Sequence, residues 1–320
     1  GIKIHNIVMR LFEFDPNALP ECASNDRARV GWERFCAANE AAGEDAEALQ
    51  TFAAALESSA PGMKLARSVF GNSPFLSACW VNDPQFTKAL LEEGPNIARD
   101  RALAATREWD PNLSEADLMR HLRVQKRRIA LTTAVADLTG VWDLFTVTHA
   151  LSNFADAAVS AAASFHLRQL DRRGKLKLKD PDNPELGSGL VILGMGKLGG
   201  RELNYSSDID LIILFDTDRV DTDQPMELSA SFVRLARGMV EMLDKRTADG
   251  YVFRTDLRLR PDPGSTPLAL STFAAETYYE SIGQNWERAA MIKARPIAGD
   301  VQAGLAFLQN LKPYIWRKSL

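Results

Sequence analysis

The first half of the chain has the residue pattern of a helical region. Residues 1 to about 175 are rich in Ala, Glu and Leu, which are strong helix formers. Within 114–140, Ser114 can cap the first turn and Gly140 can end the helix. The apolar positions of that stretch recur at roughly the spacing of one helix face: Leu118, Leu122, Ile129 and Val135. A further, alanine-rich helix is expected over 144–170.

The pattern changes after a polar loop at residues 179–189. Its sequence, KDPDNPELGSG, combines Pro, Gly, Asp and Asn, which favour turns. Short apolar runs and one alternating stretch predict strands at 190–195, 208–216 and 251–260. Helices are expected at 224–245 and over the tail from 271 to 308. We therefore predict an α+β protein, with a mainly helical region over 1–180 and a domain over 186–320 that has a small mixed sheet flanked by helices.

Acidic residues stand in two of the predicted strands. Because side chains alternate between the faces of a strand, Asp208 and Asp210 share one face of 208–216. In the third strand the same rule places Asp256 on one face with three arginines, which are Arg254, Arg258 and Arg260. An unpaired buried carboxylate is costly. Either these aspartates reach water at a strand end, or a positive group lies against them.

If the second and third strands are neighbours, three carboxylates can converge. Asp208, Asp210 and Asp256 would then repel one another and raise one another's pKa values. A hard divalent cation relieves that repulsion, and Mg²⁺ binds carboxylate oxygens while keeping waters and phosphate oxygens. The pattern therefore predicts a site for one or two Mg²⁺ ions that supports phosphoryl chemistry.

A glycine-rich segment precedes the acidic pair. GMGKLGG, at 194–200, follows the first predicted strand, and glycine lets a backbone turn sharply or approach a phosphate closely. No Gly-Lys-Ser/Thr follows it, so it is not a P-loop. Each feature taken alone has a structural alternative. The glycines could form a tight turn, Asp-x-Asp could lie at an exposed strand edge, and the arginines could lie on a solvated face.

Composition narrows the classes of function. The chain has 320 residues and a formal net charge of −4, which argues against broad, nonspecific nucleic-acid binding. No stretch approaches the roughly 20 apolar residues of a membrane span. The four histidines form no cluster and the three cysteines lack metal-ligand spacing, so a zinc site or a Ser-His-Asp triad has no support. Sparse, unpaired cysteines are typical of a cytosolic protein.

The order of these motifs resembles a known superfold. A glycine pair, a short gap, Asp-x-Asp on a strand and a third Asp on a later strand are similar to the nucleotidyltransferase superfold shared with DNA polymerase beta. Three segments resemble one family more closely, glutamine synthetase adenylyltransferase, the bifunctional adenylyltransferase/adenylyl-removing enzyme. They are GMGKLGGRELNYSSDIDLI, RTDLRLRPDPGSTPLALS and YYESIGQNWERAAMIKARPIAGD.

The likeness covers about 115–320 and rests mainly on helical character before that. The family carries two such domains in a much longer polypeptide, so the resemblance implies a fragment with one nucleotidyltransferase domain, truncated on its C-terminal side. SSDID and GQNWERAAMIKAR look like the N-terminal, adenylyl-removing domain. The role of residues 1–110 stays open.

The resemblance implies a reaction and a set of site residues. Inorganic phosphate would attack the adenylyl group on a tyrosine of glutamine synthetase and release ADP. Asp208 and Asp210 match the family's paired metal ligands, and Asp256 matches the third carboxylate. Three positions match those that hold nucleotide phosphate: Gly199, Gly200 and Ser207.

Further basic residues are candidates for the same site. Arg258 and Arg260, by the face argument, are expected to neutralise phosphate charge. For four others a structural or solvated role is an equal alternative: Lys197, Arg288, Lys293 and Arg295. Trp286 is expected in the core rather than as a stacking platform for the base.

Two other functions remain open at this point. One is ATP-dependent adenylylation of the same tyrosine, and the other is a noncatalytic nucleotide-sensing module. The resemblance also implies glutamine synthetase as protein substrate, the signal-transduction protein PII as regulator and a cytoplasmic location, with no nucleic-acid or membrane partner.

Overall fold

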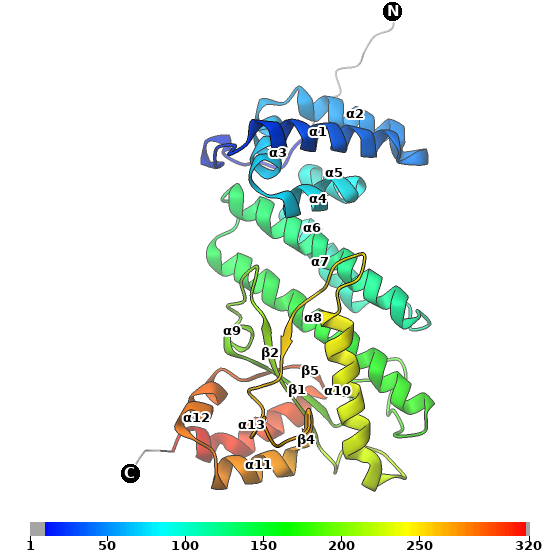
Figure 1. The fold of residues 1–320 in the computed structure, drawn as a ribbon, viewed down its shortest axis with the longest axis vertical. Helices are drawn as coiled ribbons and strands as arrows, with labels where there is room; N and C mark the ends of the chain where they lie inside the picture. Colours follow the sequence, from blue (N-terminus) through cyan, green and yellow to red (C-terminus); the bar gives the residue numbers. More distant parts are fainter. Residues whose placement is uncertain (1–9, 318–320) are drawn as a thin grey trace, which may run out of the picture. The chain divides into compact units, whose positions relative to one another are not determined.

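The computed structural model describes residues 10–317, so the outermost residues of the two predicted regions, 1–9 and 318–320, lie outside it (Figure 1). Helices account for most of residues 10–172, and a small mixed sheet with further helices follows. The predicted α+β class is therefore confirmed. Among the described helices, none combines the length and the apolar character that a membrane crossing requires.

The chain forms two compact units. Unit one contains the residues up to 104 together with 125–150, and unit two contains 105–124 together with the residues from 151 onward. Neither division falls at the loop 179–189, where the sequence places its boundary. Whether 1–180 and 186–320 are separate folding domains stays a prediction.

Unit one is built from short helices that begin at capping residues and prolines. Three of them start with a proline at the first helical position, where the missing N–H costs nothing. The helices are α1 (Asn25–Glu40), α2 (Ala46–Glu57), α3 (Ala60–Asn72), α4 (Pro74–Asn82), α5 (Pro84–Glu93) and α6 (Pro95–Arg107), with single 3₁₀ turns at Pro16–Ala18 and Gly43–Asp45. Trp80 is fully buried at the centre, with its ring edge-on to Phe35 and Phe70.

Two long helices contribute to both units. α7 (Glu115–Leu138) and α8 (Leu144–Arg172) match the helices predicted over 114–140 and 144–170. The Ser114 hydroxyl accepts a hydrogen bond from the backbone N–H of Asp117 at 3.1 Å, which is the expected N-cap. Gly140 has a φ of +71°, a left-handed conformation that suits glycine after the end of a helix.

The sheet of unit two has five strands. β1 (Leu190–Met195) lies between antiparallel neighbours β2 (Ile209–Phe215) and β5 (Arg295–Gly299). Two short strands, β3 (Thr255–Asp256) and β4 (Ala269–Ser271), pair with β2 in parallel at different positions along it. The sheet is therefore mixed, as predicted, and its order is β3-β2-β1-β5 with β4 beside β2.

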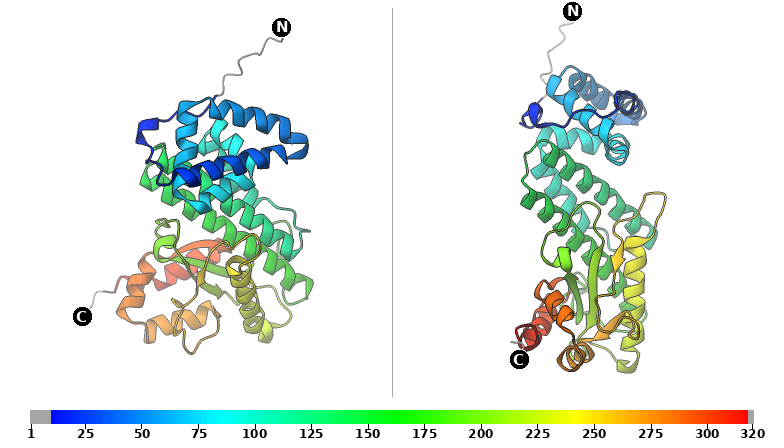
Figure 2. Two further views of the ribbon diagram at one scale, coloured as in Figure 1. Left: turned by 45° about the horizontal axis from the view of Figure 1, so that its top comes forward. Right: turned by 60° about the vertical axis from the view of Figure 1, so that its left-hand side comes forward.

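Helices cover both faces of this sheet, which explains why its central strands are apolar throughout (Figure 2). On one face, Phe215 stacks on Phe232 of α10 (Leu228–Asp244), which follows a 3₁₀ turn at Pro225–Glu227. The other face packs on α11 (Thr272–Ser281), α12 (Asn285–Ile292) and α13 (Val301–Ile315). Asp210 is the one residue of β1 and β2 that is not fully buried.

Two strand predictions need correction. The expected strand 251–260 is reduced to β3, because the chain turns after Leu257 and Arg260 fastens that turn through backbone carbonyls. β5 lies within the tail that was expected to be wholly helical. Its Pro296 lacks an N–H, a feature compatible with the edge position that β5 occupies.

The loop 179–189 is anchored to its surroundings. The Glu185 carboxylate accepts hydrogen bonds from the hydroxyls of Ser160 and Ser164 on α8 and from the N–H of Gly299 at the end of β5. Burial raises the pKa of Glu185, and these donors oppose the rise. The loop therefore ties α8 to the sheet.

Candidate active site

Strand pairing brings two of the predicted carboxylates side by side. Asp210 of β2 lies directly opposite Asp256 of β3, and the N–H of Ile209 donates to the carbonyl of Arg254 at 3.0 Å. Residues directly opposite in neighbouring strands present their side chains on the same face. Burial raises the pKa of Asp210, and the charges of Asp256 and Asp208 raise it further. The three aspartates therefore gather at one end of the sheet.

Arginines lie against the two outer carboxylates. Nε of Arg254 is 2.8 Å from Oδ1 of Asp208, and Nη2 of Arg258 is 2.6 Å from Oδ2 of Asp256. The hydrogen bonds from Arg258 lower the pKa of Asp256. No described residue donates a hydrogen bond to the Asp210 carboxylate, which lies between the two pairs. Both expected alternatives therefore occur: arginines of the neighbouring segment lie against the two outer carboxylates, and Asp208 also reaches water.

The carboxylates fit a metal by chemistry but are not arranged as a ready ligand set. Within residues 10–317, no three His, Cys, Asp or Glu side chains are grouped so that they could hold a metal ion. Oxygen donors of this kind are what Mg²⁺ binds, and the like-charge repulsion at Asp210 is what a cation relieves. Arg258 engages both oxygens of Asp256, so coordination by that carboxylate competes with Arg258, whereas Arg254 contacts Oδ1 of Asp208.

The glycine turn lies directly beside Asp210. Gly196 follows β1 with a φ of +54°, and a Cβ built on it would be 3.1 Å from Oδ2 of Asp210. It opens the one-turn helix α9 (Gly196–Gly199). The sequence singles out this glycine as a turn residue without assigning it to the site. The signal that places it there is the pairing of Met195 with Asp210.

The two glycines predicted to hold phosphate differ from each other. A Cβ on Gly199 would lie 2.1 Å from the carbonyl oxygen of Lys293, so this glycine permits close packing of two backbone segments. A Cβ on Gly200 would meet nothing closer than the Glu202 carboxyl group at 3.4 Å. Gly200 is therefore open to a ligand, whereas Gly199 is enclosed by its own fold.

The other residues predicted to contact phosphate fall into two groups, exposed side chains and side chains that bond to the protein itself. Lys197 is exposed on α9 and Arg258 is exposed beside Asp256, so both can reach a ligand. The Ser207 hydroxyl donates to the side-chain oxygen of Asn204. Arg260 donates to the carbonyl of Leu257, which precedes it, and to three carbonyls of the following loop, those of Pro263, Thr266 and Pro267. Its guanidinium thereby organises the loop.

Arg295 and its neighbours have structural partners. Arg295 forms a two-pronged ion pair with Asp156 of α8, at 2.7 and 3.1 Å, and donates to the carbonyls of Leu198 and Gly199. It therefore fastens the end of the glycine turn to α8. Lys293 lies 3.4 Å from Glu202 in an exposed pair.

The segment NWERAAM forms α12, and one expectation for it was wrong. Trp286 is 51% exposed, so it does not belong to the core. The buried residues there are Glu287 and Met291, and Glu287 accepts hydrogen bonds from the Tyr278 hydroxyl and the Gln284 N–H. Arg288 donates to the carbonyl of Arg317.

A family model described as Glutamate-ammonia ligase adenylyltransferase matches residues 63–310, well over half of the chain. The chain belongs to this family. The match begins before residue 115, so the likeness extends further into the helical region than the motifs alone indicate. Membership makes the chain part of a nucleotidyltransferase enzyme family.

Curated relatives of this adenylyltransferase family member carry the name bifunctional glutamine synthetase adenylyltransferase/adenylyl-removing enzyme. The protein from Mesorhizobium japonicum is 50% identical over 275 residues, which are 85% of this chain and 28% of the relative. Those from Xanthobacter autotrophicus and Rhizobium meliloti are 47% and 48% identical over 78% and 83% of this chain, and 25% and 28% of their own lengths. The chain thus spans little more than a quarter of these relatives.

Two residues that the structure places at or behind the site were not identified from the sequence. Arg254 was predicted to lie on one face with Asp256 but was not assigned to Asp208, and Asp156 was not selected. Asp156 is the single charged residue within 144–167 of an alanine-rich helix, and that pattern could have pointed to it.

Proposed function

We propose that this chain removes AMP from an adenylylated tyrosine of glutamine synthetase by phosphorolysis. The observation that carries the proposal is the register of Asp210 with Asp256, beside Asp208 and an open glycine turn, in a chain of this family. Removal is preferred over addition because SSDID and NWERAAM resemble the adenylyl-removing domain. Glutamine synthetase as substrate is supported by the names of the relatives, whereas PII as regulator and a cytoplasmic location are proposed on the resemblance alone.

In the proposed reaction an oxygen of inorganic phosphate forms a bond to the adenylyl phosphorus. The bond from that phosphorus to the tyrosine oxygen breaks, the tyrosine oxygen takes a proton, and ADP leaves. Gly200, Lys197 and Arg258 are the groups that can approach the phosphates, by backbone contact and by positive charge. Ser207 would assist through its hydroxyl, while Gly199 would keep the turn in place.

Mg²⁺ would be held by Asp208, Asp210 and Asp256, as one or two ions. When bound, it would neutralise charge on the phosphoryl oxygens. The two arginines would exchange their carboxylate partners for phosphate, because guanidinium groups bind both anions in the same planar manner. Arg260 would take no part in this exchange, because its guanidinium N–H groups donate to backbone carbonyls of the loop.

Mass spectrometry of adenylylated glutamine synthetase tests the proposal. Incubated with the chain, Mg²⁺ and phosphate, the synthetase should lose the mass of AMP while ADP accumulates. Omitting phosphate or chelating Mg²⁺ should stop the loss. AMP addition to unmodified synthetase from ATP, with pyrophosphate release, would favour the alternative of ATP-dependent adenylylation. Nucleotide binding without turnover in either direction would favour a sensing module and contradict the enzymatic proposal.

A further inference from the structure

A buried arginine of α7 lies outside the site described above. Arg123 is 1% exposed, yet it carries a full charge on a side chain surrounded by protein. Its Nε donates to the carbonyl of Gly250 at 2.8 Å, and Nη2 donates to that of Lys245 at 2.6 Å. Nη1 donates to the carbonyls of Met119 and Met242, both at 3.0 Å. One guanidinium group therefore donates hydrogen bonds to four backbone carbonyls.

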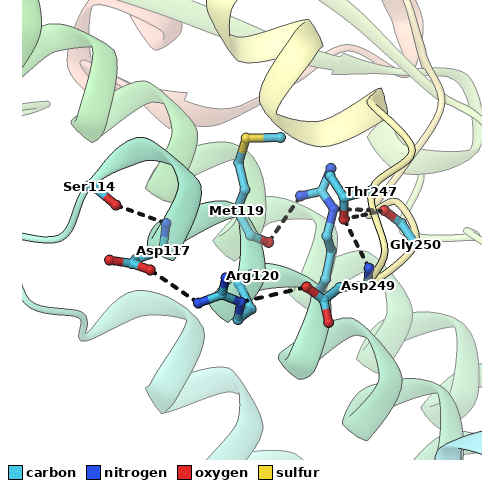
Figure 3. Close-up of polar contacts among 8 residues, drawn as sticks. Ser114, Asp117, Met119, Arg120, Thr247, Asp249 and Gly250 are labelled. Carbon is cyan, nitrogen blue, oxygen red and sulfur yellow. Dashed lines mark hydrogen bonds and ion pairs between the residues drawn. The ribbon is translucent and has the colours of Figure 1, made fainter.

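Three of these carbonyls belong to the segment that leads into β3. Met242 lies in the last turn of α10, Lys245 caps it, and Gly250 closes a tight turn with Thr247 through two backbone hydrogen bonds of 3.0 Å. Figure 3 shows this turn facing Met119 and Arg120 of α7. The chain then passes back along the end of α10, where the N–H groups of Val252 and Phe253 donate to the carbonyl of Leu243.

The same segment delivers two groups of the acidic cluster. Arg254, the partner of Asp208, and Asp256, the partner of Asp210 in the strand register, follow Gly250 within one short stretch. β3 itself pairs at only two positions, so its ladder alone provides little to fix its register. Its register therefore depends on the contacts that precede it, which are the Arg123 hydrogen bonds and the backbone bonds and buried side chains of Val252 and Phe253.

We propose that Arg123 is a positioning residue, which sets the placement of β3 and so of Asp256 and Arg254 against β2. Its relevance to catalysis rests on the proposed function. A lysine cannot reproduce the effect, because an ammonium on a flexible stem lacks the fixed fork that reaches carbonyls on three sides. Without the fork, the buried carbonyl of Met242 loses this donor, and the carbonyls of Lys245 and Gly250 lose their bond to α7, although Gly250 still accepts from the N–H of Thr247. The segment is then free to shift relative to α7.

Arg120 provides a matched control one turn away. It lies on the same helix and contacts the same turn through Asp249, at 3.7 Å, but its side chain is 62% exposed. Its second partner, Asp117, is on its own helix at 3.2 Å (Figure 3). Removing this exposed charge changes the contact with the turn and leaves the buried fork intact.

The experiment compares Arg123→Lys, Arg120→Gln and Phe307→Leu in the full chain. Phe307→Leu loosens the buried helical face behind the sheet and supplies a variant of lowered stability with Arg123 present. Amide hydrogen exchange is followed in peptides covering 250–257, 208–212 and 190–195, with thermal melting as the measure of global stability. Steady-state AMP removal is measured at a temperature where all variants are folded, with kcat and KM separated.

For Arg123→Lys we expect exchange at least tenfold faster in 250–257 and at the Ile209 amide, with β1 protected as in the parent chain. We expect kcat to fall by about tenfold to a hundredfold while the KM for adenylylated synthetase stays within twofold, because the misplaced groups act on the reacting phosphates and not on docking of the protein substrate. Arg120→Gln should change each quantity by less than twofold. Phe307→Leu should speed exchange in β1 as much as in β3.

Other outcomes overturn the proposal. Unchanged exchange in 250–257 would show that Arg123 does not hold the segment. Exchange raised equally in β1 would show a loss of global stability only. Locally faster exchange with an unchanged kcat would leave Arg123 without a role in the reaction. If the parent chain neither removes nor adds AMP, the proposed function fails by that result, and the exchange comparison alone decides whether Arg123 positions β3.

Discussion

Asp210 has a different environment from the two aspartates that flank it. Arginines hold Asp208 and Asp256, whereas Asp210 is partly buried and repelled by both neighbours. Groups whose pKa values are shifted in this way are candidates for function, because a fold gains no stability from them. The residue is therefore the most informative single position in the cluster.

We predict that Asp210→Asn abolishes AMP removal and does not harm the fold. Loss of one carboxylate from the set should reduce kcat at least about a hundredfold. The amide is nearly the same size and relieves a like-charge pair across two strands, so stability should rise by about 0.2–1 kcal/mol. Activity assays and urea unfolding check both parts. A fully active variant would refute the assignment of Asp210.

The adjacent glycines allow a paired test. Gly199→Ala should destabilise the protein by about 1–3 kcal/mol or more, because the new methyl group meets the backbone oxygen of Lys293. The favourable effect of alanine in a helix, about 1 kcal/mol, is too small to offset this clash. Gly200→Ala, with no contact under 3.4 Å, should leave thermal stability unchanged and raise the KM for phosphate or weaken nucleotide binding. Equal melting curves for the two variants would contradict this reading of the turn.

At the scale of elements, α8 is joined to the site by polar contacts. Asp156 holds Arg295, which holds the end of α9, and the Ser152 hydroxyl accepts from the N–H of Leu203 at 3.2 Å. Burial raises the pKa of Asp156, and the hydrogen bond and charge of Arg295 oppose the rise. The helix is therefore part of the scaffold that shapes the glycine turn.

We predict that Asp156→Ala lowers the free energy of unfolding by about 3–5 kcal/mol, because it leaves a largely buried guanidinium without its counter-charge. Glu202→Ala breaks the exposed pair with Lys293 nearby and should cost less than about 1 kcal/mol. Denaturant titration of both variants measures the difference. Similar losses would show that the buried pair contributes no more than the exposed one.

The elements that sequence patterns predicted are those that local physics determines. α7, α8, β1, β2 and α10 follow from apolar runs, periodicity and caps. β3, β4 and β5 are short edge strands fixed by pairing with β2 or β1, a tertiary effect that no local pattern carries. The acidic residues were found because carboxylates in an apolar strand are conspicuous. The arginine partners depended on side-chain direction in a segment that proved to be mostly turn.

At the scale of the whole molecule, stability depends on a buried titratable group. His166 of α8 packs against Gly238 of α10, where a Cβ would lie 2.4 Å from the imidazole. Burial lowers the pKa of His166 to about 4, although a hydrogen bond to the backbone of Gly238 acts in the other direction. The folded protein therefore keeps this imidazole neutral at pH values where the unfolded chain protonates it.

We predict that this histidine makes the folded state less stable as the pH falls from 6.5 to 4. In that window the unfolded state binds the proton and the folded state does not, so stability falls with pH by an amount on the order of 3 kcal/mol. His166→Asn, which cannot titrate, should show a shallower loss in urea unfolding at the same pH values. Parallel pH profiles for the two proteins would count against a buried neutral histidine.

The interleaving of the two units along the chain affects how the protein can be dissected. Unit two begins with residues 105–124, the chain then returns to unit one for residues 125–150, and unit two continues from residue 151. A shortened gene that starts at codon 151 would therefore delete Arg123 and remove the side-chain donor that the carbonyls of Gly250, Met242 and Lys245 share. Isolating the sheet-bearing half intact would instead require splicing residue 124 to residue 151 through an artificial bridge.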